Sequence, residues 1–357
     1  MKRWLRLVVG GCTMTLLCAL SACSDLGYYV DCARGHLSLL SRRQPVEELL
    51  RAESTPIELR QRLEEIELLR DFASDRLSLP ENGSYRCYAD LERPYVVWNV
   101  VAADEFSLSP RTWCFPIAGC VSYRGYYSEE QANAFAETLR QKGADVYLYG
   151  VPAYSTLGWF DDPLLNTFVE APLTSVAGTI FHELAHQQFY VKDDSAFNEA
   201  FAQVVEETGV RLWLQETEGA AGVIRWEKKR QRQEEMAVLL DATREELMTL
   251  YTSGQAPEIL RQRKEEILTA LRATLATFRP QGTGARAFDL WLARPFNNAR
   301  FVSSATYREL VPPLRQLLQQ AEGDLTIFYR EVEKLGDLGM LERRAHLAVI
   351  ARPAESS

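Results

Sequence analysis

Apolar side chains recur at helical spacing through the first part of the chain, between residues 28 and 79. The regularity is clearest after Thr55-Pro56, where a proline stands at a position that favours the start of a helix. The apolar stripe of this segment consists of Ile57, Leu59, Leu63, Ile66 and Leu69, interspersed with charged residues. The pattern predicts N-terminal helices over residues 28–79, with the stripe packed in the core.

A different pattern begins after the turn-like residues 80–83. Aromatic and β-branched residues crowd the stretch from residue 85 to residue 127, most densely at residues 95–101 (YVVWNVV). Such a composition predicts strands and their connections. We therefore expect the sheet region of the protein over residues 85–160.

One helix is expected inside this sheet region. Ser128 and Gln131 form a capping-box pattern, which predicts a helix that starts there and stops at Gly143. Residues 146–149 (VYLY) predict a further strand.

The second half of the chain is predicted to be helical almost throughout. Two helices are expected within residues 173–215, the second starting near Asp194 or Ser195, either of which is a good N-cap. Residues 222–350 form a C-terminal helical region, in which Ser253-Gly254 separates two long polar-rich helices. The patterns together predict an α+β protein, predominantly helical, with a small mixed β-sheet beside the helix that carries the motif described next.

That motif is H-E-L-A-H, with His182, Glu183 and His186. Residues four apart lie on one face of a helix, so the two histidines can hold one metal ion. Glu183 then points to the side of the metal, where a bound water would lie and could lose its proton to the carboxylate. Zinc suits two imidazoles, a carboxylate and an open position. A chance match is the alternative interpretation, but two of only four histidines fall in the motif, among uncharged neighbours.

Glu199 in N-E-A-F-A is the predicted third metal ligand, because it lies on the next expected helix. A further histidine six residues after His186 is the other common solution, but Lys192 stands there. Four other acidic residues compete with Glu199, namely Asp193, Asp194, Glu206 and Glu207. Asp193 and Asp194 occupy a connection where the chain must turn, so a role in the turn is the competing interpretation of both.

Glu206 has a second possible role. It lies seven residues after Glu199, hence on the same helix face, and could serve as a ligand or could support one. Gln203 occupies the position at which such sites often have an acid that orients a metal-binding histidine.

The start of the chain predicts export. Residues 1–22 carry basic residues and then an apolar run that is short for a membrane span, which is typical of a signal peptide. The sequence Leu-Ser-Ala-Cys resembles a bacterial lipobox, with Cys23 as the lipid attachment site, and Ser24 favours the outer membrane of a Gram-negative bacterium. We expect a lipoprotein on the periplasmic face of that membrane, with one domain over residues 23–350 and a tail over 351–357.

Charge and cysteine content agree with this environment. The formal charge changes from −9 to −12 on loss of the leader, which carries three positive charges, and such acidity argues against a nucleic-acid partner. Four cysteines remain apart from Cys23 and those of the leader, an even number in an oxidising compartment. Cys114 and Cys120 flank a short segment that a disulfide could close, and Cys32 with Cys87 is the complementary pair.

Residues 152–163 (PAYSTLGWFDDP) form an aromatic, turn-rich loop before the motif helix, and we expect this loop to line one wall of the cleft. Tyr154 within it is a candidate to stabilise the oxyanion of a tetrahedral intermediate. Tyr126, Tyr190 and Tyr307 are alternatives, and a buried structural tyrosine is the competing interpretation of each.

Several segments together resemble the bacterial putative aminopeptidase family, which groups lipoprotein-like chains with a zincin-type HExxH motif. They include W-C-F-P-I-A-G-C, P-A-Y-S-T-L-G-W-F-D-D-P, the HELAH helix and N-N-A-R-F, and the similarity spans nearly the whole mature chain. The resemblance implies that His182 and His186 bind zinc and that Glu183 is the base of a peptidase. The G-x-M-E-N strand with which well-known aminopeptidases hold the free amine is absent, so Asp161 or Asp162 would have to bind it.

Three hypotheses follow for the function. The first is a zinc metallopeptidase that acts on peptides or proteins, with the family name implying an aminopeptidase. The second is a zincin-like lipoprotein that binds peptides or envelope proteins and cuts little or nothing, an option that Gln203 in place of an acid keeps open. A purely structural metal is the third, and it leaves Glu183 without a role.

Overall fold

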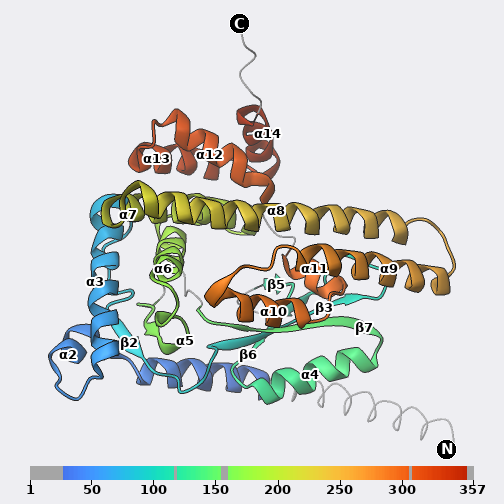
Figure 1. Cartoon of the computed structure of the whole chain (residues 1–357), viewed down its shortest axis with the longest axis horizontal. Coiled ribbons are helices and arrows are strands. Elements are labelled where there is room, and N and C mark those ends of the chain that lie inside the picture. Colours follow the sequence, from blue (N-terminus) through green and yellow to red (C-terminus); the bar gives the residue numbers. More distant parts are fainter. Residues whose placement is uncertain (1–26, 116–118, 154–159, 305–307, 352–357) are drawn as a thin grey trace, which may run out of the picture.

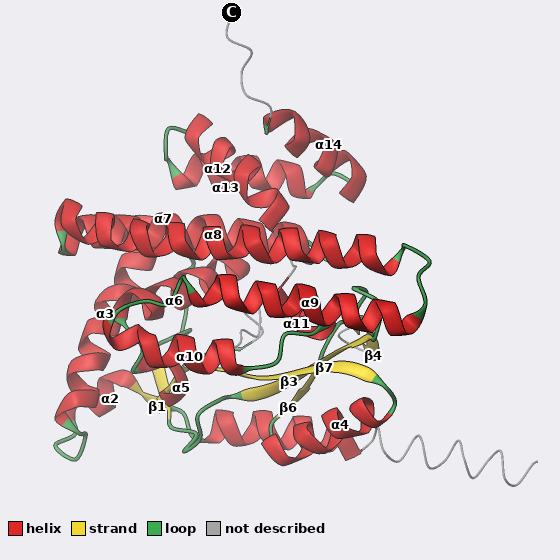
Figure 2. Cartoon of the chain, turned by 45° about the vertical axis from the view of Figure 1, so that its right-hand side comes forward, coloured by secondary structure: helices red, strands yellow, loops and turns green. Residues whose placement is uncertain are grey.

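The computed structural model describes residues 27–115, 119–153, 160–304 and 308–351. The leader, Cys23, Tyr154 and Tyr307 lie outside these residues. Within them the chain is mostly helical with small sheets, as an α+β protein is (Figures 1 and 2). None of the described helices is both long and apolar enough to cross a membrane.

The helices follow the expected distribution along the chain. Residues 27–41 form the first described helix. The labelled helices are α2 (Val46–Arg51), α3 (Ile57–Leu77), α4 (Glu129–Gln141), α5 (Asn166–Val169), α6 (Leu173–Gln188), α7 (Ser195–Thr217), α8 (Gly219–Tyr251), α9 (Pro257–Ala276), α10 (Ala285–Ala293), α11 (Asn298–Ser304), α12 (Val311–Gln320), α13 (Leu325–Gly336) and α14 (Met340–Ile350). Single 3-10 turns occur at Gly282–Gly284 and Arg308–Leu310.

Helix α4 shows why the local signals were informative. Ser128 is its N-cap and accepts a hydrogen bond from the backbone N–H of Gln131 at 3.3 Å, as the capping-box pattern predicts. Gly143 follows the helix with a φ of +78°, a left-handed conformation that glycine adopts without a steric penalty.

The strands form three small sheets rather than one. Strands β1 (Gln44–Pro45), β2 (Cys87–Ala89) and β8 (Leu164–Leu165) form a mixed sheet, because β1 is antiparallel and β8 parallel to β2. Strands β6 (Arg124–Tyr126), β3 (Val97–Asp104) and β7 (Ala144–Val151) form an antiparallel sheet. The prediction of a single mixed sheet was therefore wrong, since residue patterns reveal strands but not which strands pair.

A third pair of strands, β4 (Trp113–Phe115) and β5 (Gly119–Val121), is antiparallel with Cys114 opposite Cys120. These two cysteines form a disulfide. The expected second disulfide is absent, because Cys32 and Cys87 are free and have different neighbours. Burial raises the pKa of both thiols, and Cys32 contacts Tyr28 whereas the charge nearest Cys87 is that of Arg43.

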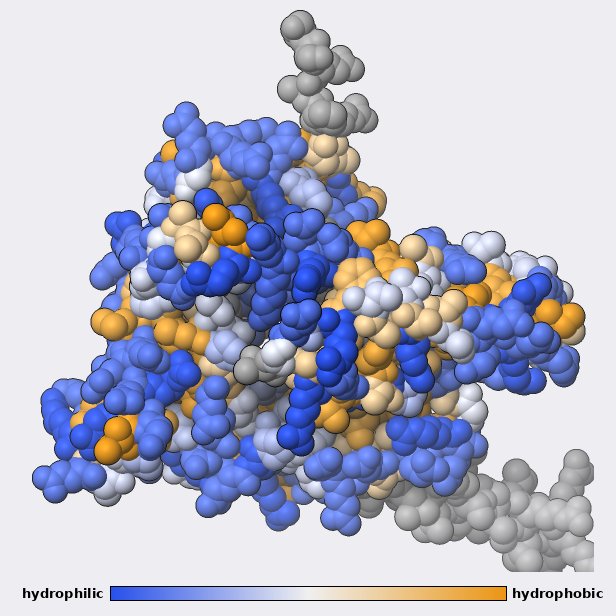
Figure 3. All heavy atoms as spheres, in the orientation of Figure 1, coloured by the Kyte–Doolittle hydropathy of each residue, from blue (hydrophilic) through white to orange (hydrophobic). Residues whose placement is uncertain are grey.

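The largest hydrophobic core lies around α6 and α7 and is completed by α3 and α12 to α14 (Figure 1). Gly209 allows the close approach of α7 to its neighbours: a Cβ there would lie 2.6 Å from both Leu77 and Phe181. A second core joins the β6-β3-β7 sheet to α4, and a third joins α8, α9 and the segment around Phe301. Hydrophilic residues dominate the outer face shown in Figure 3.

Asn298 joins α8 to the β3–β7 sheet. Its side-chain amide donates to the carbonyl oxygens of Asp104 and Glu105, its carbonyl accepts from the Tyr251 hydroxyl, and its backbone N–H donates to Asp145. The residue is fully buried, so it serves as a structural anchor.

Candidate metal centre

Helices α6 and α7 carry the predicted ligands, and the short turn between them determines how these face each other. Asp193 adopts a left-handed conformation in this turn, with a φ of +63°, and Asp194 caps α7 by accepting from the N–H of Phe197 at 3.2 Å. The Asn198 side chain accepts from the N–H of Val191 at 2.8 Å and donates to its carbonyl at 2.7 Å. These contacts fasten the turn to the first residues of α7 and so place Glu199 opposite α6.

Asp194 is also held from the far end of the chain. It forms a buried ion pair with Arg343 of α14. Arg343 donates in addition to three backbone carbonyls, those of Leu335, Gly336 and Leu338. Asp194 therefore serves as cap and ion-pair partner, and is not a metal ligand in this arrangement.

The structure brings His182, His186 and Glu199 together. The Nε2 atom of His182 lies 3.3 Å from one oxygen of Glu199, and Nε2 of His186 lies 3.5 Å from the other. One donor atom from each residue falls within 4.8 Å of the other two, so this group could hold a metal ion. The two imidazole rings stand nearly perpendicular, with centroids 4.9 Å apart.

Glu206 supports this group from a position seven residues, or about two helical turns, further along α7. Its Oε2 lies 3.0 Å from Nδ1 of His182, the nitrogen that faces away from Glu199. Gly178 leaves room for the carboxylate, since a Cβ at that position would lie 2.9 Å from Oε1 of Glu206. Glu206 thus holds the role that the sequence assigned to the position of Gln203.

Gln203 and Glu207 belong to a separate polar cluster. Gln203 donates to Glu207 at 2.9 Å, and Arg315 of α12 forms two hydrogen bonds of 2.9 Å with the same carboxylate. Arg230 of α8 completes the cluster. Glu207 therefore joins α7 to α8 and α12 and does not contribute to the metal group.

The pKa values of the residues in the centre indicate that it favours a bound positive charge. Burial disfavours the charged form of His182, but hydrogen bonds to Glu199 and Glu206 outweigh this and raise its pKa to about 10. Burial and the adjacent His182 lower the pKa of His186 to about 4. Burial of Glu183, reinforced by the charge of Glu199, raises its pKa to about 7. In the metal-free protein His182 is therefore protonated between two carboxylates and His186 is neutral, and a bound cation would take the place of that positive charge.

These residues fit a zinc ion by their chemistry. Two imidazoles and one carboxylate are the usual protein donors of a catalytic zinc site. Glu206 can accept a hydrogen bond from Nδ1–H of His182, which leaves Nε2 as the metal-binding nitrogen. Among the described residues, the Nδ1 atom of His186 is buried with no hydrogen-bond partner.

Two of the described tyrosines lie near His186 and Glu199, and the sequence pointed to only one of them. Tyr190 is half exposed, with its ring centroid 6.4 Å from that of His186. Burial and the charges of Glu199 and Tyr190 raise the pKa of Tyr123, which precedes β6. No spacing in the sequence links residue 123 to residue 199. Tyr126, another predicted candidate, packs instead against Tyr28 in the core of the antiparallel sheet.

The face of α6 that carries Glu183 is fastened to the segment before β2 by Gln187, one turn further along the helix. Gln187 accepts a hydrogen bond from Asn82 at 2.8 Å and donates to Ser84 at 3.2 Å and to the buried carboxylate of Asp162 at 3.4 Å. Tyr85 is buried there with a left-handed φ of +65°, and its N–H donates to the carbonyl of Asp162 at 2.6 Å. No pattern in the sequence predicts this network.

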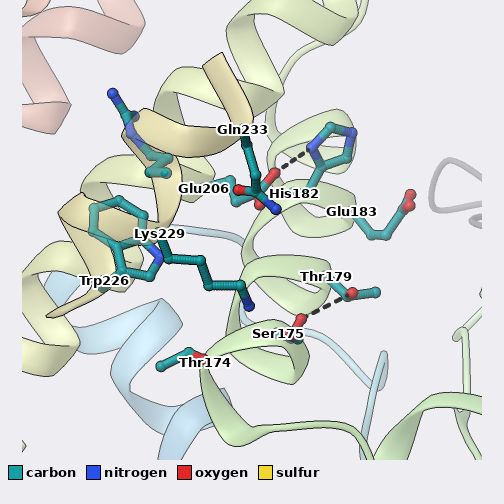
Figure 4. Close-up of a pocket in the computed structure, with 10 residues that line it drawn as sticks. Thr174, Ser175, Thr179, His182, Glu183, Glu206, Trp226, Lys229 and Gln233 are labelled. Atoms are coloured by element: carbon teal, nitrogen blue, oxygen red, sulfur yellow. Dashed lines mark hydrogen bonds and ion pairs between the residues drawn. The ribbon is translucent and has the colours of Figure 1, made fainter. Parts of the chain in front are cut away.

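A cavity of about 330 Å³ lies beside the centre, between α6 and α8. His182, Glu183 and Glu206 line one part of it, and residues of α8 line another (Figure 4). The remaining lining residues are Thr174, Ser175, Thr179, Trp226, Lys229, Arg230 and Gln233. The cavity therefore gives a ligand of the size of an amino-acid side chain access to His182 and Glu183.

Comparison with known proteins gives one positive finding. The model of a family described as putative aminopeptidase matches residues 27–347, which include every residue of the centre. No curated protein and no solved structure matches the chain.

Proposed function

The chain belongs to the putative aminopeptidase family, and we propose that it is a zinc-dependent metallopeptidase of the zincin type that hydrolyses peptide bonds. The observation that carries the proposal is the convergence of His182, His186 and Glu199, whose donor atoms lie within 4.8 Å of one another. The family description supports peptides as the substrate class. The donor set supports zinc, because it leaves a coordination position open for chemistry.

Zinc in this site would polarise the scissile carbonyl and lower the pKa of a water molecule. Glu183 would take the proton of the attacking water and pass it to the leaving amine. Its pKa of about 7, which burial raises, suits a group that both accepts and releases a proton near neutral pH. Glu206 would hold His182 in one tautomer and orientation.

The hydroxyl of a tyrosine would donate to the developing oxyanion. Tyr123 and Tyr190 are the described tyrosines that lie near Glu199 and His186. Tyr154 stays a prediction.

Cleavage of a peptide next to its free amino terminus would require an acidic side chain that binds the amine. Asp162 is the better placed of the two predicted acids, because its charge acts on both Glu183 and Tyr85. Asp161 is exposed and lies against Gly83.

The alternative of a non-catalytic peptide-binding protein rested on Gln203. Because Glu206 makes the contact to His182 that an acid at position 203 would make, Gln203 no longer favours that alternative.

Zinc analysis combined with peptide turnover tests the proposal. We expect the purified protein to bind one zinc ion and to cleave peptides from a broad library. Glu183→Gln should keep the zinc and lose turnover, whereas Glu199→Gln should lose the zinc. A zinc-loaded protein that cleaves no peptide would support the binding alternative, and a protein that binds no zinc would refute the metal centre.

We further propose that the chain is a lipoprotein attached through Cys23 to the periplasmic face of the outer membrane. The lipobox-like sequence supports this. Replacement of Cys23 by serine should release the protein from the membrane fraction, and a wild-type protein found only in the soluble fraction would contradict it.

A further inference from the structure

Lys229 is an unpaired cation in the cavity beside the metal centre. It projects from α8 towards the Ser175–Thr179 stretch of α6 (Figure 4) and lines the same cavity as His182 and Glu183. Within the described residues, no hydrogen bond or ion pair engages its ammonium group. Lys229 is exposed, so solvent satisfies its charge until a ligand of opposite sign takes the place of water.

Its neighbour on α8 behaves differently. Arg230 also lines the cavity, but its guanidinium pairs with Glu207 and with Glu234 and lies over the Trp226 ring, 5.4 Å from the centroid. These contacts position this turn of α8 against α7, and they hold Lys229 beside the cavity.

The wall opposite Lys229 offers hydrogen-bond donors. The hydroxyls of Thr174 and Ser175 make no hydrogen bond within the described residues, whereas Thr179 donates to the carbonyl of Ser175 at 3.1 Å. An ammonium group and two free hydroxyls can all donate to an anion. The acidic residue Glu206 lines the cavity too, but its carboxylate is engaged with His182.

We propose that the cavity between α6 and α8 is a substrate subsite that binds a carboxylate of the peptide, with Lys229 as its charged partner. This inference rests on the proposed peptidase function, because it assigns the substrate a direction: the free amine must lie away from Lys229, on another side of the centre. The carboxylate belongs to an acidic side chain or to the peptide's carboxyl terminus, and both sources offer the same group to the ammonium ion.

A set of matched peptides tests the subsite in the zinc-loaded protein. Hexapeptides with a free amino terminus carry one glutamate at successive positions, each with a glutamine counterpart, and every peptide is made as a C-terminal acid and as an amide. We expect kcat/KM to favour the carboxylate at one location by about threefold to fivefold, the range for a partly solvated ion pair. Preference for glutamate identifies a side chain, and preference for the acid over the amide identifies the terminus.

Two lysine variants locate the effect. Lys229→Met should remove the preference, through a higher KM for the charged peptides alone, and Lys229→Arg should keep part of it. Lys228→Met is the matched control: it makes the same charge change on the same helix outside the cavity lining, and the preference should persist. Equal turnover of charged and neutral peptides by the wild type, or a preference that survives in Lys229→Met, would overturn the subsite.

Failure of the subsite is distinguishable from failure of the peptidase function. If no peptide is cleaved, the same peptides are titrated by calorimetry against zinc-loaded Glu183→Gln with and without Lys229→Met. Tighter binding of the carboxylate-bearing peptide that depends on Lys229 would support the subsite without turnover. Equal binding of all peptides would refute it.

Discussion

The contact between Glu206 and His182 provides the sharpest test of how the centre is built. The Oε2 atom of Glu206 lies 3.0 Å from Nδ1 of His182. This contact determines which imidazole nitrogen carries a proton and leaves Nε2 directed at Glu199. Glu206→Ala removes the contact completely, whereas Glu206→Gln keeps an acceptor and loses the charge.

The magnitude follows from the position of Glu206 behind a metal ligand. Removal of a hydrogen-bond partner of a metal-binding histidine typically lowers metal affinity by about 10-fold to 100-fold. This corresponds to about 1.4–2.7 kcal/mol of binding free energy. We expect the larger loss in Glu206→Ala and a smaller one in Glu206→Gln.

Zinc affinity measured by competition with a chelator is the assay, and Glu207→Gln is the matched control. Glu207 is adjacent in the sequence but pairs with Arg315 and Arg230, so its replacement should leave zinc affinity unchanged. In the metal-free protein, Glu206→Ala should also lower the pKa of His182, because one of its two carboxylate partners is lost. Wild-type zinc affinity in Glu206→Ala would refute the reasoning, and a loss as complete as that of Glu199→Gln would make Glu206 itself a ligand.

Three further predictions concern stability. Burial raises the pKa of Glu183 from 4.5 to about 7, so its ionisation destabilises the metal-free protein increasingly as pH rises between these values, by about 3 kcal/mol above them. Urea unfolding should therefore show metal-free Glu183→Gln to be more stable than the wild type at pH 8 and equally stable near pH 4. Equal stability of the two proteins at both pH values would contradict this. Gly209→Ala should lower the free energy of unfolding by about 1–3 kcal/mol, since its methyl would lie 2.6 Å from Phe181, and an unchanged urea midpoint would show that the helices can separate without cost. Asp194→Ala should lower the free energy of unfolding by about 3–5 kcal/mol, because it leaves the charge of Arg343 buried without its carboxylate partner. A decrease below about 1 kcal/mol in urea unfolding would mean that water replaces the carboxylate.

Local chemistry in the sequence was sufficient to predict most helices. The core part of the α3 stripe (Leu63, Ile66 and Leu69), the Ser128 cap of α4 and the break between α8 and α9 each depend on residues within a few positions of one another. The prediction that Ile57 packs in the core was wrong: this first residue of α3 is 67% exposed. The spacing of His182 and His186 likewise depends only on helix geometry. These features could be predicted because a single element determines each of them.

Interactions between elements were less accessible. The three-sheet arrangement depends on strand pairing, and the pairing expected for Cys32 with Cys87 failed because their neighbours come from different parts of the chain. The chain path brings three further residues close to the centre, and their spacing in the sequence does not indicate this: Tyr85, Tyr123 and Asp162.

The sequence by itself determined the donor types of the centre: two histidines on one face of a helix, a glutamate beside them, and an acid on the next helix. Only the tertiary structure decided which role each acidic residue has. The turn fastened by Asn198 places Glu199 against both imidazoles and Glu206 behind one of them, while Glu207 turns to Arg315. The physical reason is that residues on one helix face are equivalent in sequence spacing, and only the packing of α7 against its neighbours makes them different.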